Sequence, residues 1–469
     1  MRVREVPAFP GDTIAAVATP PGEGAIGIVR LSGPEAIRCA QAVFRGRRAL
    51  AELPSHTLTR GAVVGSGGEI IDDVLVSVMQ APHTYTGEDV VEINCHGGIL
   101  VVETVLQRLL EAGARPARRG EFTQRAFLNG KLDLAQAEAV IDIVRARSPK
   151  GLALAARQLE GELSRRVSAV RERILHLLGR LQVVIDYPEE DLSELSDAEA
   201  AAELAALEAE VNALLAGADA GKVYRDGVRL AIVGRPNVGK SSLLNALLRD
   251  ERAIVTEIAG TTRDTIDASA VIRDIPLTLV DTAGLRETED PVERIGVART
   301  RAAIETADIV LVVVDGSQAL AREDDEVFAA LRASGREDDL IVVVNKADLP
   351  PVVTDEELHA RAPGRPLVRV SAKSGLGLEA LEERVAQAAL GGSGAQGGEI
   401  LVAKARHRQA LEEARMLLQS AREGLAAGMT ADVITLDLQG ALGVLGSITG
   451  DQVAEEIVAH IFAEFCVGK

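Results

Sequence analysis

The sequence predicts a multi-domain protein in which an N-terminal α+β domain precedes a helical domain that carries an inserted α/β domain. Three observations support this prediction. Short apolar runs alternate with helical stretches up to about residue 128. From Leu132 onward, apolar residues recur every three or four positions instead. Between two such helical regions, strand-like runs each end in a polar or glycine-rich motif, which is typical of an open α/β sheet.

Length and composition are compatible with several folded domains. The chain has 469 residues, enough for roughly three domains of 100–200 residues. Its 47% hydrophobic content can fill real cores and excludes wholesale disorder. The formal net charge of -19 argues against a protein that coats nucleic acid, because phosphate contacts need lysine and arginine. A local basic patch is still compatible with this charge, and residues 115–119 (Arg-Pro-Ala-Arg-Arg) are one candidate.

Cysteine usage and hydropathy predict the compartment. Cys39, Cys95 and Cys466 are far apart and odd in number, so they indicate neither a disulfide framework nor a zinc site. Residues 1–10 contain no apolar signal segment, and no window approaches about 18 uninterrupted apolar residues. We therefore expect a soluble, cytoplasmic protein without stable membrane association.

Residues 1–128 are predicted to form the α+β domain. We expect strands at 13–18, 25–31, 73–79 and 90–94, helices at 34–44 and 100–111, and turns at 19–22 and 65–68. Arg30, Glu92, His96 and Lys131 stand beside turns or strand ends. Taken singly, each of these four is an ordinary surface or satisfied polar group.

The next region is helical. One long helix is indicated by a single apolar stripe, formed by Leu163, Val167, Val170, Ile174, Leu177, Leu181 and Val184. Pro188 ends this helix, and residues 198–215 form a second one. Residues 216–227 contain three glycines and are predicted to be a hinge.

Helices return after the α/β domain. The glycine-rich segment 391–398 is predicted to be a flexible linker, followed by helices over residues 411–425 and 451–465. The predicted domain limits are 1–128, 129–226 for the first helical part, 227–390 for the α/β domain, and 391–469 for the second helical part.

A glycine-rich loop at residues 234–241, Gly-Arg-Pro-Asn-Val-Gly-Lys-Ser, organises the α/β domain. The apolar run 228–233 leads into it, and the amphipathic segment 242–248 follows. Strand, loop and helix in this order predict a phosphate-binding loop rather than a chance match in a surface loop.

The chemistry of this loop is local. Gly234 and Gly239 let backbone N–H groups curl around nucleotide phosphates, and the new helix adds its positive dipole end. Lys240 reaches the β- and γ-phosphates. Ser241 offers a hydroxyl to Mg²⁺, and Thr262 is the natural second ligand.

Three further motifs, at residues 281–284, 345–348 (the guanine motif) and 371–373, indicate a guanine nucleotide. Asp281 is placed to reach Mg²⁺, and Gly284 to donate to the γ-phosphate. Asp348 can accept both N–H donors of the guanine edge, a pair that adenine lacks, so it should select GTP over ATP. The predicted nucleotide contacts are Asn237, Val238, Gly239, Lys240, Ser241, Ser242, Thr256, Glu257, Ile258, Ala259, Gly260, Thr261, Thr262, Asp281, Thr282, Ala283, Gly284, Asn345, Lys346, Asp348, Ser371, Ala372 and Lys373.

The motif details predict a cation-assisted GTPase. Leu285 occupies the position where many regulatory GTPases carry a glutamine that orients water. Asn237, with backbone oxygens near Thr256, Ile258 and Thr261, offers ligands to a K⁺ ion, which would neutralise developing charge. The alternative, in which Asn237 only rigidifies the loop, stays open.

Short motifs near both ends of the chain carry a family resemblance. They are Ala18-Thr19-Pro20-Pro21-Gly22, Gly27-Ile28-Val29-Arg30-Leu31-Ser32-Gly33, Thr86-Gly87-Glu88-Asp89-Val90-Val91-Glu92, His96-Gly97-Gly98, Gly120-Glu121-Phe122-Thr123, Arg125-Ala126-Phe127-Leu128-Asn129-Gly130-Lys131 and Phe465-Cys466-Val467-Gly468-Lys469. With them the chain resembles, end to end, the MnmE (TrmE) family of GTPases that modify the wobble uridine of tRNA. Its departures are Val467, where isoleucine is common, and the glycine-rich linker.

The resemblance implies a homodimer formed through the N-terminal domain. That domain would bind a tetrahydrofolate derivative, 5-formyl- or methylene-tetrahydrofolate, through Arg30, Glu92, Lys131 and Lys469. Cations suit the anionic glutamate tail of a folate, and a carboxylate suits the donors of its pterin ring. The resemblance also implies a tRNA substrate and the FAD-dependent partner MnmG, with which carbon 5 of the uridine receives a carboxymethylaminomethyl or aminomethyl group.

The resemblance also implies a catalytic set. Glu293 matches the proposed general base, Arg286 would guide the rearrangement of the switch, and potassium would assist hydrolysis together with Asn237 and Lys240. Cys466 on the tail has two open interpretations, a small packing residue or a thiol or proton shuttle.

Two other functions compete with this interpretation. A ribosome-assembly GTPase that binds rRNA would be expected to carry a basic appendage, whereas the C-terminal segment here is helical and mixed in charge. A scaffold with a vestigial GTPase is disfavoured because every motif is intact. Folate binding by the first domain would separate the first interpretation from both alternatives.

Overall fold

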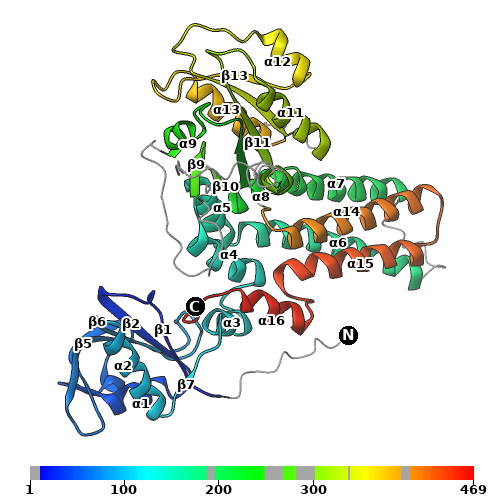
Figure 1. Ribbon diagram of the computed structural model, residues 1–469. Coiled ribbons are helices and arrows are strands. Elements are labelled where there is room, and N and C mark those ends of the chain that lie inside the picture. Colours follow the sequence, from blue (N-terminus) through cyan, green and yellow to red (C-terminus); the bar gives the residue numbers. More distant parts are fainter. Residues whose placement is uncertain (1–10, 187–195, 249–267, 281–301, 336–338, 392–401) are drawn as a thin grey trace. The chain divides into compact units, whose positions relative to one another are not determined.

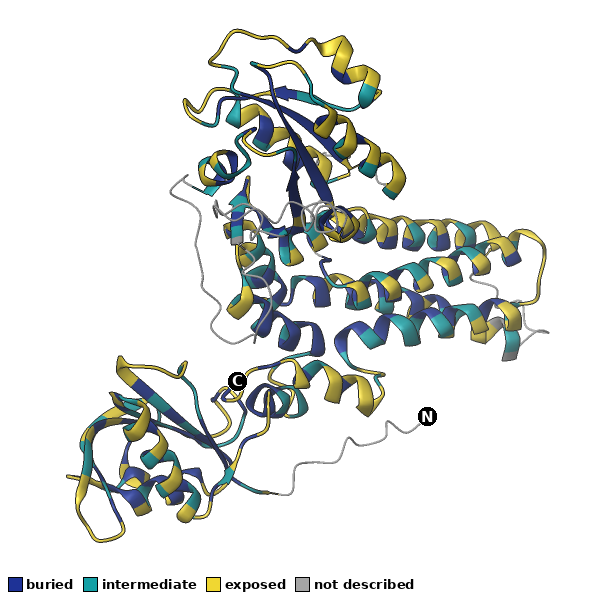
Figure 2. Cartoon of the chain, in the orientation of Figure 1, coloured by how far each residue is buried: buried dark blue, intermediate teal, exposed yellow. Residues whose placement is uncertain are grey.

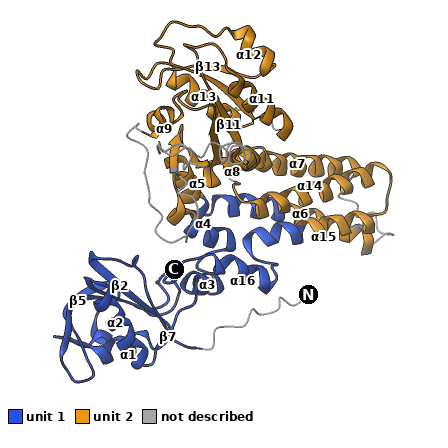
Figure 3. Cartoon of the chain, in the orientation of Figure 1, with its two compact units in different colours: residues 1–141, 158–172, 442–469 blue, residues 142–157, 173–441 orange. Residues whose placement is uncertain are grey.

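The computed structural model describes residues 11–186, 196–248, 268–280, 302–335, 339–391 and 402–469. The chain separates into two compact units (Figure 3). Unit 1 contains residues 1–141, 158–172 and 442–469, and unit 2 contains residues 142–157 and 173–441. Each unit therefore contains more than one stretch of the chain.

Unit 1 is built on a seven-stranded sheet in the order β3-β4-β5-β6-β2-β1-β7 (Figure 1). The strands are β1 (Ile14–Val17), β2 (Gly24–Ser32), β3 (Phe44–Gly46), β4 (Thr57–Val64), β5 (Ile70–Met79), β6 (Val90–Gly97) and β7 (Arg115–Pro116). Only β1 and β7 pair in parallel. The four predicted strands are confirmed as β1, β2, β5 and β6. The other three escape the apolar pattern because β3 and β7 are very short and β4 has few buried positions.

One face of this sheet forms the core of unit 1. Helices α1 (Ala36–Val43) and α2 (Ile99–Glu111), both predicted, pack on it. Val29, Leu31, Val91 and Ile93 point to this face and are buried. Because successive side chains of a strand alternate between faces, Arg30 and Glu92 lie on the other face, where they are half-buried.

Two short helices and the end of the chain form a second cluster in unit 1. Helices α3 (Glu121–Leu128) and α16 (Glu455–Ala463) bring together the rings of Phe127, Phe462 and Phe465. The helix predicted over residues 451–465 is thus shorter than expected. Phe465 lies beyond its end and is still fully buried.

The helical prediction is confirmed in its main features. The long helices are α4 (Leu134–Arg145), α5 (Pro149–Leu159), α6 (Glu162–Asp186), α7 (Asp197–Leu215), α14 (Ala405–Ala426) and α15 (Ala431–Thr449). The stripe from Leu163 to Leu181 is buried along α6, while Pro188 lies outside the described residues. Ser196 caps α7 in a capping box with Glu199. Within unit 2, α7 packs along α14.

The predicted hinge at residues 216–227 is wrong, because helix α8 (Ala218–Asp226) occupies it. Its glycines do not break it. Gly217 precedes the helix, Gly221 is buried inside it, and Gly227 ends it with a φ of 77°. Tyr224 is buried on the same helix, so burial of one face outweighs the poor helix propensity of a single glycine.

Helix α15 was not among the predicted helices, because apolar residues fill most of its surface and blur the periodicity. Among the described residues it is the one helix long and apolar enough to cross a membrane by length and composition. A core helix passes the same test, and Ile434, Leu438, Ala441, Leu445 and Ile448 are buried.

Unit 2 contains a six-stranded sheet in the order β13-β12-β11-β8-β10-β9. The strands are β8 (Val228–Val233), β9 (Ala268–Ile272), β10 (Ile275–Val280), β11 (Ile309–Asp315), β12 (Leu340–Asn345) and β13 (Leu367–Arg369). All pair in parallel except β9, which is antiparallel to β10. The predicted strands are confirmed as β8, β10, β12 and β13; central β11 was not predicted.

Helices cover both faces of this sheet. On one face lie α9 (Lys240–Leu248) and α13 (Leu378–Ala389), and on the other α11 (Arg322–Ser334) and α12 (Asp355–Arg361). All residues of β11 and β12 are buried, and Figure 2 shows these central strands in dark blue. Such a doubly covered parallel sheet binds ligands at the carboxyl ends of its strands, where the predicted motifs lie.

Candidate functional sites

The predicted phosphate loop connects β8 to α9. Gly234 and Gly239 have φ angles of 153° and 95°, a region that favours glycine. A Cβ atom on Gly234 would lie 2.3 Å from the carbonyl oxygen of Val313, and one on Gly239 would lie 2.2 Å from Nδ2 of Asn345. Both glycines are therefore required by conformation and by space, and the expected strand–loop–helix arrangement is confirmed.

Lys240 lies against the backbone of this loop. Its Nζ donates hydrogen bonds of 2.8 Å to the carbonyl oxygens of Gly234 and Arg235. Burial of the ammonium lowers the pKa of Lys240. Ser241 and Ser242 follow in the first turn of α9, where backbone N–H groups favour an anion. The loop thus collects the donors that phosphate binding requires.

Asn345 connects the phosphate loop to the motifs predicted to recognise guanine. Its Nδ2 donates to the carbonyl oxygen of Val238 at 2.8 Å, and its Oδ1 accepts from the N–H of Ala372 at 3.1 Å. Val238 and Asn345 are buried. A single amide side chain therefore holds three separate segments of the chain together, and the structure brings these predicted residues into one site.

The other residues predicted to recognise guanine lie close to Asn345 and Ala372 in the chain. Lys346 forms an ion pair of 2.7 Å with Asp315, which lies at the end of β11 and was not predicted as a site residue. Asp348 is exposed, and a hydrogen bond from the Ser371 hydroxyl lowers the pKa of its carboxyl group. Asp348 is therefore ionised at neutral pH, as an acceptor for two N–H donors must be. Lys373 is exposed nearby in sequence.

Two side chains in the loop have distinct orientations. Arg235 forms a 3.1 Å ion pair with Asp324 in the first turn of α11 and donates to Gln318 at 3.3 Å. Its guanidinium is thus engaged by α11 and the segment before it. Asn237 adopts a φ of 63°, a left-handed conformation that asparagine tolerates better than most residues. This geometry is compatible with both interpretations of Asn237.

Part of the predicted site lies outside the described residues. These are Thr256, Glu257, Ile258, Ala259, Gly260, Thr261, Thr262, Asp281, Thr282, Ala283, Gly284, Leu285, Arg286 and Glu293. They include the second Mg²⁺ ligand and the backbone K⁺ ligands that the sequence predicts, and the general base that the family resemblance implies.

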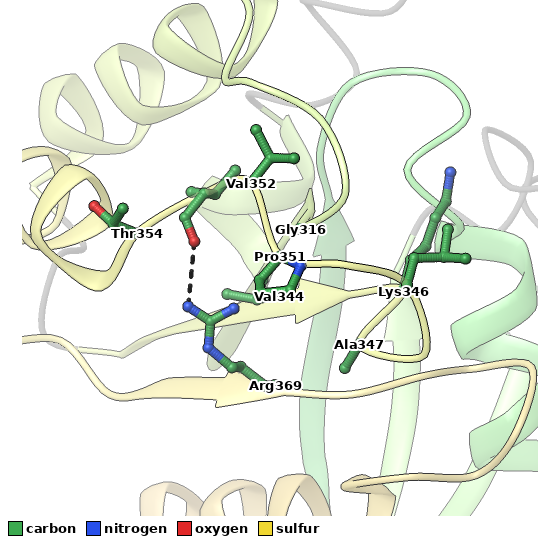
Figure 4. A pocket seen from close by; sticks show the side chains of 10 residues that line it. Gly316, Val344, Lys346, Ala347, Pro351, Val352, Thr354 and Arg369 are labelled. Atoms are coloured by element: carbon green, nitrogen blue, oxygen red, sulfur yellow. Dashed lines mark hydrogen bonds between the residues drawn. The ribbon is translucent and has the colours of Figure 1, made fainter.

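A pocket of about 360 Å³ lies beside the guanine motif (Figure 4). It is lined by Gly316, Val344, Lys346, Ala347, Leu349, Pro351, Val352, Val353, Thr354 and Arg369. Arg369 donates to the carbonyl oxygen of Val353 at 3.3 Å and to Asp355 at 2.6 Å. The guanidinium of Arg369 thus already has partners. No phosphate-loop residue lines the pocket, so the pocket is separate from the phosphate-binding end of the site.

The second predicted site lies on the face of the unit 1 sheet opposite helices α1 and α2. Arg30 on β2 and Glu92 on β6 are direct cross-strand partners, and Arg30 Nε lies 2.8 Å from Glu92 Oε1. The guanidinium carbon lies 5.9 Å from the ring centre of Tyr85 and 5.7 Å from that of Phe122. Arg30 Nη1 also donates to the carbonyl oxygen of Gly468 at 3.3 Å. We call these five residues the Arg30 site.

The other predicted residues of unit 1 have different surroundings. Lys131 is exposed and donates to the carbonyl oxygen of Pro82 at 3.0 Å. His96 pairs with Asp72 at 2.6 Å. Cys466 is exposed and Lys469 half-buried. The structure thus brings Arg30 and Glu92 into direct contact and joins Gly468 of the tail to them.

The buried cysteines are poor nucleophiles. Burial raises the pKa of the Cys39 thiol and raises that of Cys95 to about 11. Only the thiol of Cys466 is exposed.

Tyr85 and Phe122, which complete the Arg30 site, were missed from the sequence because nothing in their spacing connects them to Arg30.

A cluster of charges around the buried side chains of Arg125 and Glu121 was also missed. Arg125 is 1% exposed and pairs with Asp12 at 2.7 Å, Glu88 at 3.1 Å and Glu121 at 3.2 Å. Arg115 pairs with Asp12 and Glu121, both at 2.5 Å. Burial would raise the pKa of Glu121, but hydrogen bonds led by that from Arg115 outweigh it and hold the pKa at about 2. We call these five residues the Arg125 cluster.

The Arg125 cluster changes the interpretation of residues 115–119 as a basic patch. Arg115 is neutralised by acids, Arg118 lies 3.5 Å from Glu121, and Arg119 donates to the carbonyl oxygen of Phe465 at 2.8 Å. These arginines stabilise unit 1 rather than form an unpaired basic surface.

Comparisons with known proteins agree with this arrangement. The model of the MnmE helical domain matches residues 134–466, and that of the GTP-binding protein TrmE N-terminus matches residues 13–131. Relatives named tRNA modification GTPase MnmE include one from Enterococcus faecalis, 46% identical over 98% of both chains. Another, from Heliobacterium modesticaldum, is 50% identical over 98% of this chain and 100% of its own. This chain belongs to the MnmE family of tRNA modification GTPases.

A solved structure matches a smaller part of this member of the MnmE family. The G domain of the T. maritima FeoB iron transporter covers 34% of this chain and 98% of its own, with 25% identity and a TM-score of 0.26.

Proposed function

We propose that this chain is a potassium-stimulated GTPase that modifies carbon 5 of the wobble uridine of certain tRNAs with a tetrahydrofolate one-carbon unit. The group added would be of the carboxymethylaminomethyl or aminomethyl type. The observation that carries the proposal is the 46–50% identity to tRNA modification GTPases along 98% of this chain. The phosphate loop and the Arg30 site support it, because they offer donors for a nucleotide and for a folate in different units.

The proposed organisation assigns a role to each part of the chain. Residues 1–128 would bind folate and form the dimer, and residues 227–390 would form the GTPase domain. That domain would be inserted into a helical domain made of residues 129–226 and 391–469. The helical family model supports this arrangement, because it spans residues on both sides of the phosphate loop.

In the nucleotide site, Lys240 and the loop N–H groups would hold phosphates, and Ser241, Thr262 and Asp281 would serve Mg²⁺. Glu293 would act as general base, with Arg286 guiding the switch. Bound K⁺ supplies positive charge where phosphoryl transfer accumulates negative charge. The exposed side chain of Asn237 fits one ligand position of that ion, since it presents an amide oxygen inside the phosphate loop.

In the Arg30 site, Arg30 and Lys131 would bind the anionic tail of a reduced folate, together with Lys469. Glu92 would accept from the pterin donors. The donor set fits such a ligand, because Arg30 and Glu92 are half-exposed and two aromatic rings flank the guanidinium. The protein would act on tRNA as a homodimer, together with the FAD-dependent protein MnmG. Cys466 would serve as a thiol or proton shuttle.

The potassium role is tested by two substitutions of Asn237. GTP hydrolysis should be slow in Na⁺ and stimulated by K⁺ at equal ionic strength. Asn237→Ala removes the amide oxygen but also places alanine at a φ of 63°, which costs about 1–2 kcal/mol. Asn237→Gly removes the oxygen and keeps the backbone relaxed. Loss of potassium stimulation in both variants is expected; if Asn237→Gly retains it, the side chain only shapes the loop.

The modification itself is tested by nucleoside analysis of tRNA. We expect cells that lack this protein to lose the carbon 5 modification of the wobble uridine, and a plasmid copy to restore it. An unchanged nucleoside profile would contradict the proposed function.

A further inference from the structure

The last residues of the chain are held in unit 1 by backbone contacts. The N–H of Gly120 donates to the carbonyl oxygen of Cys466 at 3.3 Å, and Arg119 donates to that of Phe465 at 2.8 Å. Phe465 is fully buried. The tail, residues 465–469, is therefore docked in this structure.

Gly468 packs closely against the end of β1. Its φ is 93°, and a Cβ atom placed on it would lie 2.2 Å from the carbonyl oxygen of Val17 and 3.0 Å from Cα of Ala18. The N–H of Ala18 donates to the carbonyl oxygen of Ile28 at 2.8 Å, so this stretch is tied to the sheet. Because the obstacle is backbone rather than a flexible side chain, only glycine fits here.

The same residue also contacts the Arg30 site. The carbonyl oxygen of Gly468 accepts a hydrogen bond from Arg30 Nη1, while Nε of Arg30 is held by Glu92. Gly468 therefore lies between the end of β1 and the Arg30–Glu92 pair. Lys469 follows it directly, so the position of Gly468 determines where that last residue begins.

We propose that Gly468 is a positioning residue of the Arg30 site. Its fit against Val17 sets the path of the tail, and this path delivers Lys469 to the cation set formed by Arg30 and Lys131. A ligand with two carboxylates is best held by several cations converging from different segments. The inference rests on the proposed function of the site, because the ligand it concerns is a reduced folate.

The test measures binding of 5-formyltetrahydrofolate to the full chain by titration calorimetry. Gly468→Ala should weaken binding about tenfold or more, because a displaced Lys469 loses a charge-assisted contact. Val467→Ala is the matched control, since Val467 is the exposed neighbour and should bind as the wild type does. GTP hydrolysis by Val467→Ala should also equal that of the wild type, because the phosphate loop belongs to unit 2.

A double-mutant cycle gives the second readout. If Gly468 acts by placing Lys469, then Gly468→Ala combined with Lys469→Ala should bind no more weakly than Lys469→Ala alone. Additive losses would overturn the positioning role. Wild-type binding by Gly468→Ala would overturn this inference alone, whereas failure of the wild-type chain to bind would overturn the proposed function of the site as well.

Discussion

The nucleotide site and the Arg30 site differ in how their residues are distributed along the chain. The phosphate loop is one contiguous segment between β8 and α9, and its own backbone forms the binding surface. The Arg30 site instead joins five segments, and Arg30 and Gly468 are 438 residues apart. A site made by local backbone can be predicted from a motif, whereas a site made by distant side chains depends on the fold.

The two regions also differ in their charge balance. The ammonium of Lys240 is bonded to neutral carbonyl oxygens. In unit 1, Arg125 and Arg115 share the carboxylates of Asp12 and Glu121 at close range. Lys240 therefore retains attraction for a phosphate, while both arginines of the Arg125 cluster are already paired with carboxylates and stabilise the fold.

The largest expected effect tests whether the two regions work independently. Lys240→Ala should lower the rate of GTP hydrolysis by about 10²–10³-fold, because it removes a charge that stabilises the transition state. Folate binding by the same variant should be unchanged. Lys222→Ala, which alters an exposed lysine of α8, is the control and should retain activity. A matching loss of folate binding in Lys240→Ala would contradict the independence of the sites.

A second prediction tests whether the Arg125 cluster stabilises unit 1 through the charge of Glu121. Glu121 has its pKa lowered from 4.5 to about 2, which corresponds to roughly 3 kcal/mol of stability. Because the folded pKa is the lower one, this stability is present above about pH 4.5 and is lost as the pH falls toward about 2. Glu121→Gln should therefore destabilise unit 1 strongly at pH 7 and progressively less in acid.

The measurement must resolve one unit, because a multi-domain chain does not unfold in two states. Urea-dependent hydrogen exchange of peptides from β1 and β2 reports on unit 1. Glu111→Gln is the control, since Glu111 pairs with Arg108 near the surface and should cost less than about 1 kcal/mol. A pH-independent loss in Glu121→Gln would show that its charge is not the cause.

The same contrast explains which features were predictable. The strands β8, β10 and β12 and their motifs follow from apolar runs that end in functional residues. The Arg125 cluster could not be predicted, because buried charges look like surface charges until their partners are known. The prediction of a hinge at residues 216–227 was also wrong because of tertiary contacts. Burial of Tyr224 stabilises α8, and the glycine content of the segment does not reveal this burial. Arg30 and Glu92 were found through family motifs, and their contact follows from the strand register.

The smallest expected effect tests the part of the nucleotide site that depends on a single exposed side chain. Asp348→Asn should weaken GTP binding about tenfold or more and favour xanthosine triphosphate, because one acceptor becomes a donor. The variant should fold normally, since Asp348 is exposed and its Ser371 partner can still donate to an amide oxygen. Glu356→Gln removes an equal charge from exposed α12 and should bind GTP as the wild type does. Competition between the two nucleotides for a fluorescent analogue measures the switch. Unchanged preference for GTP in Asp348→Asn would mean that guanine is recognised elsewhere and that the motif, although contiguous, does not define the base.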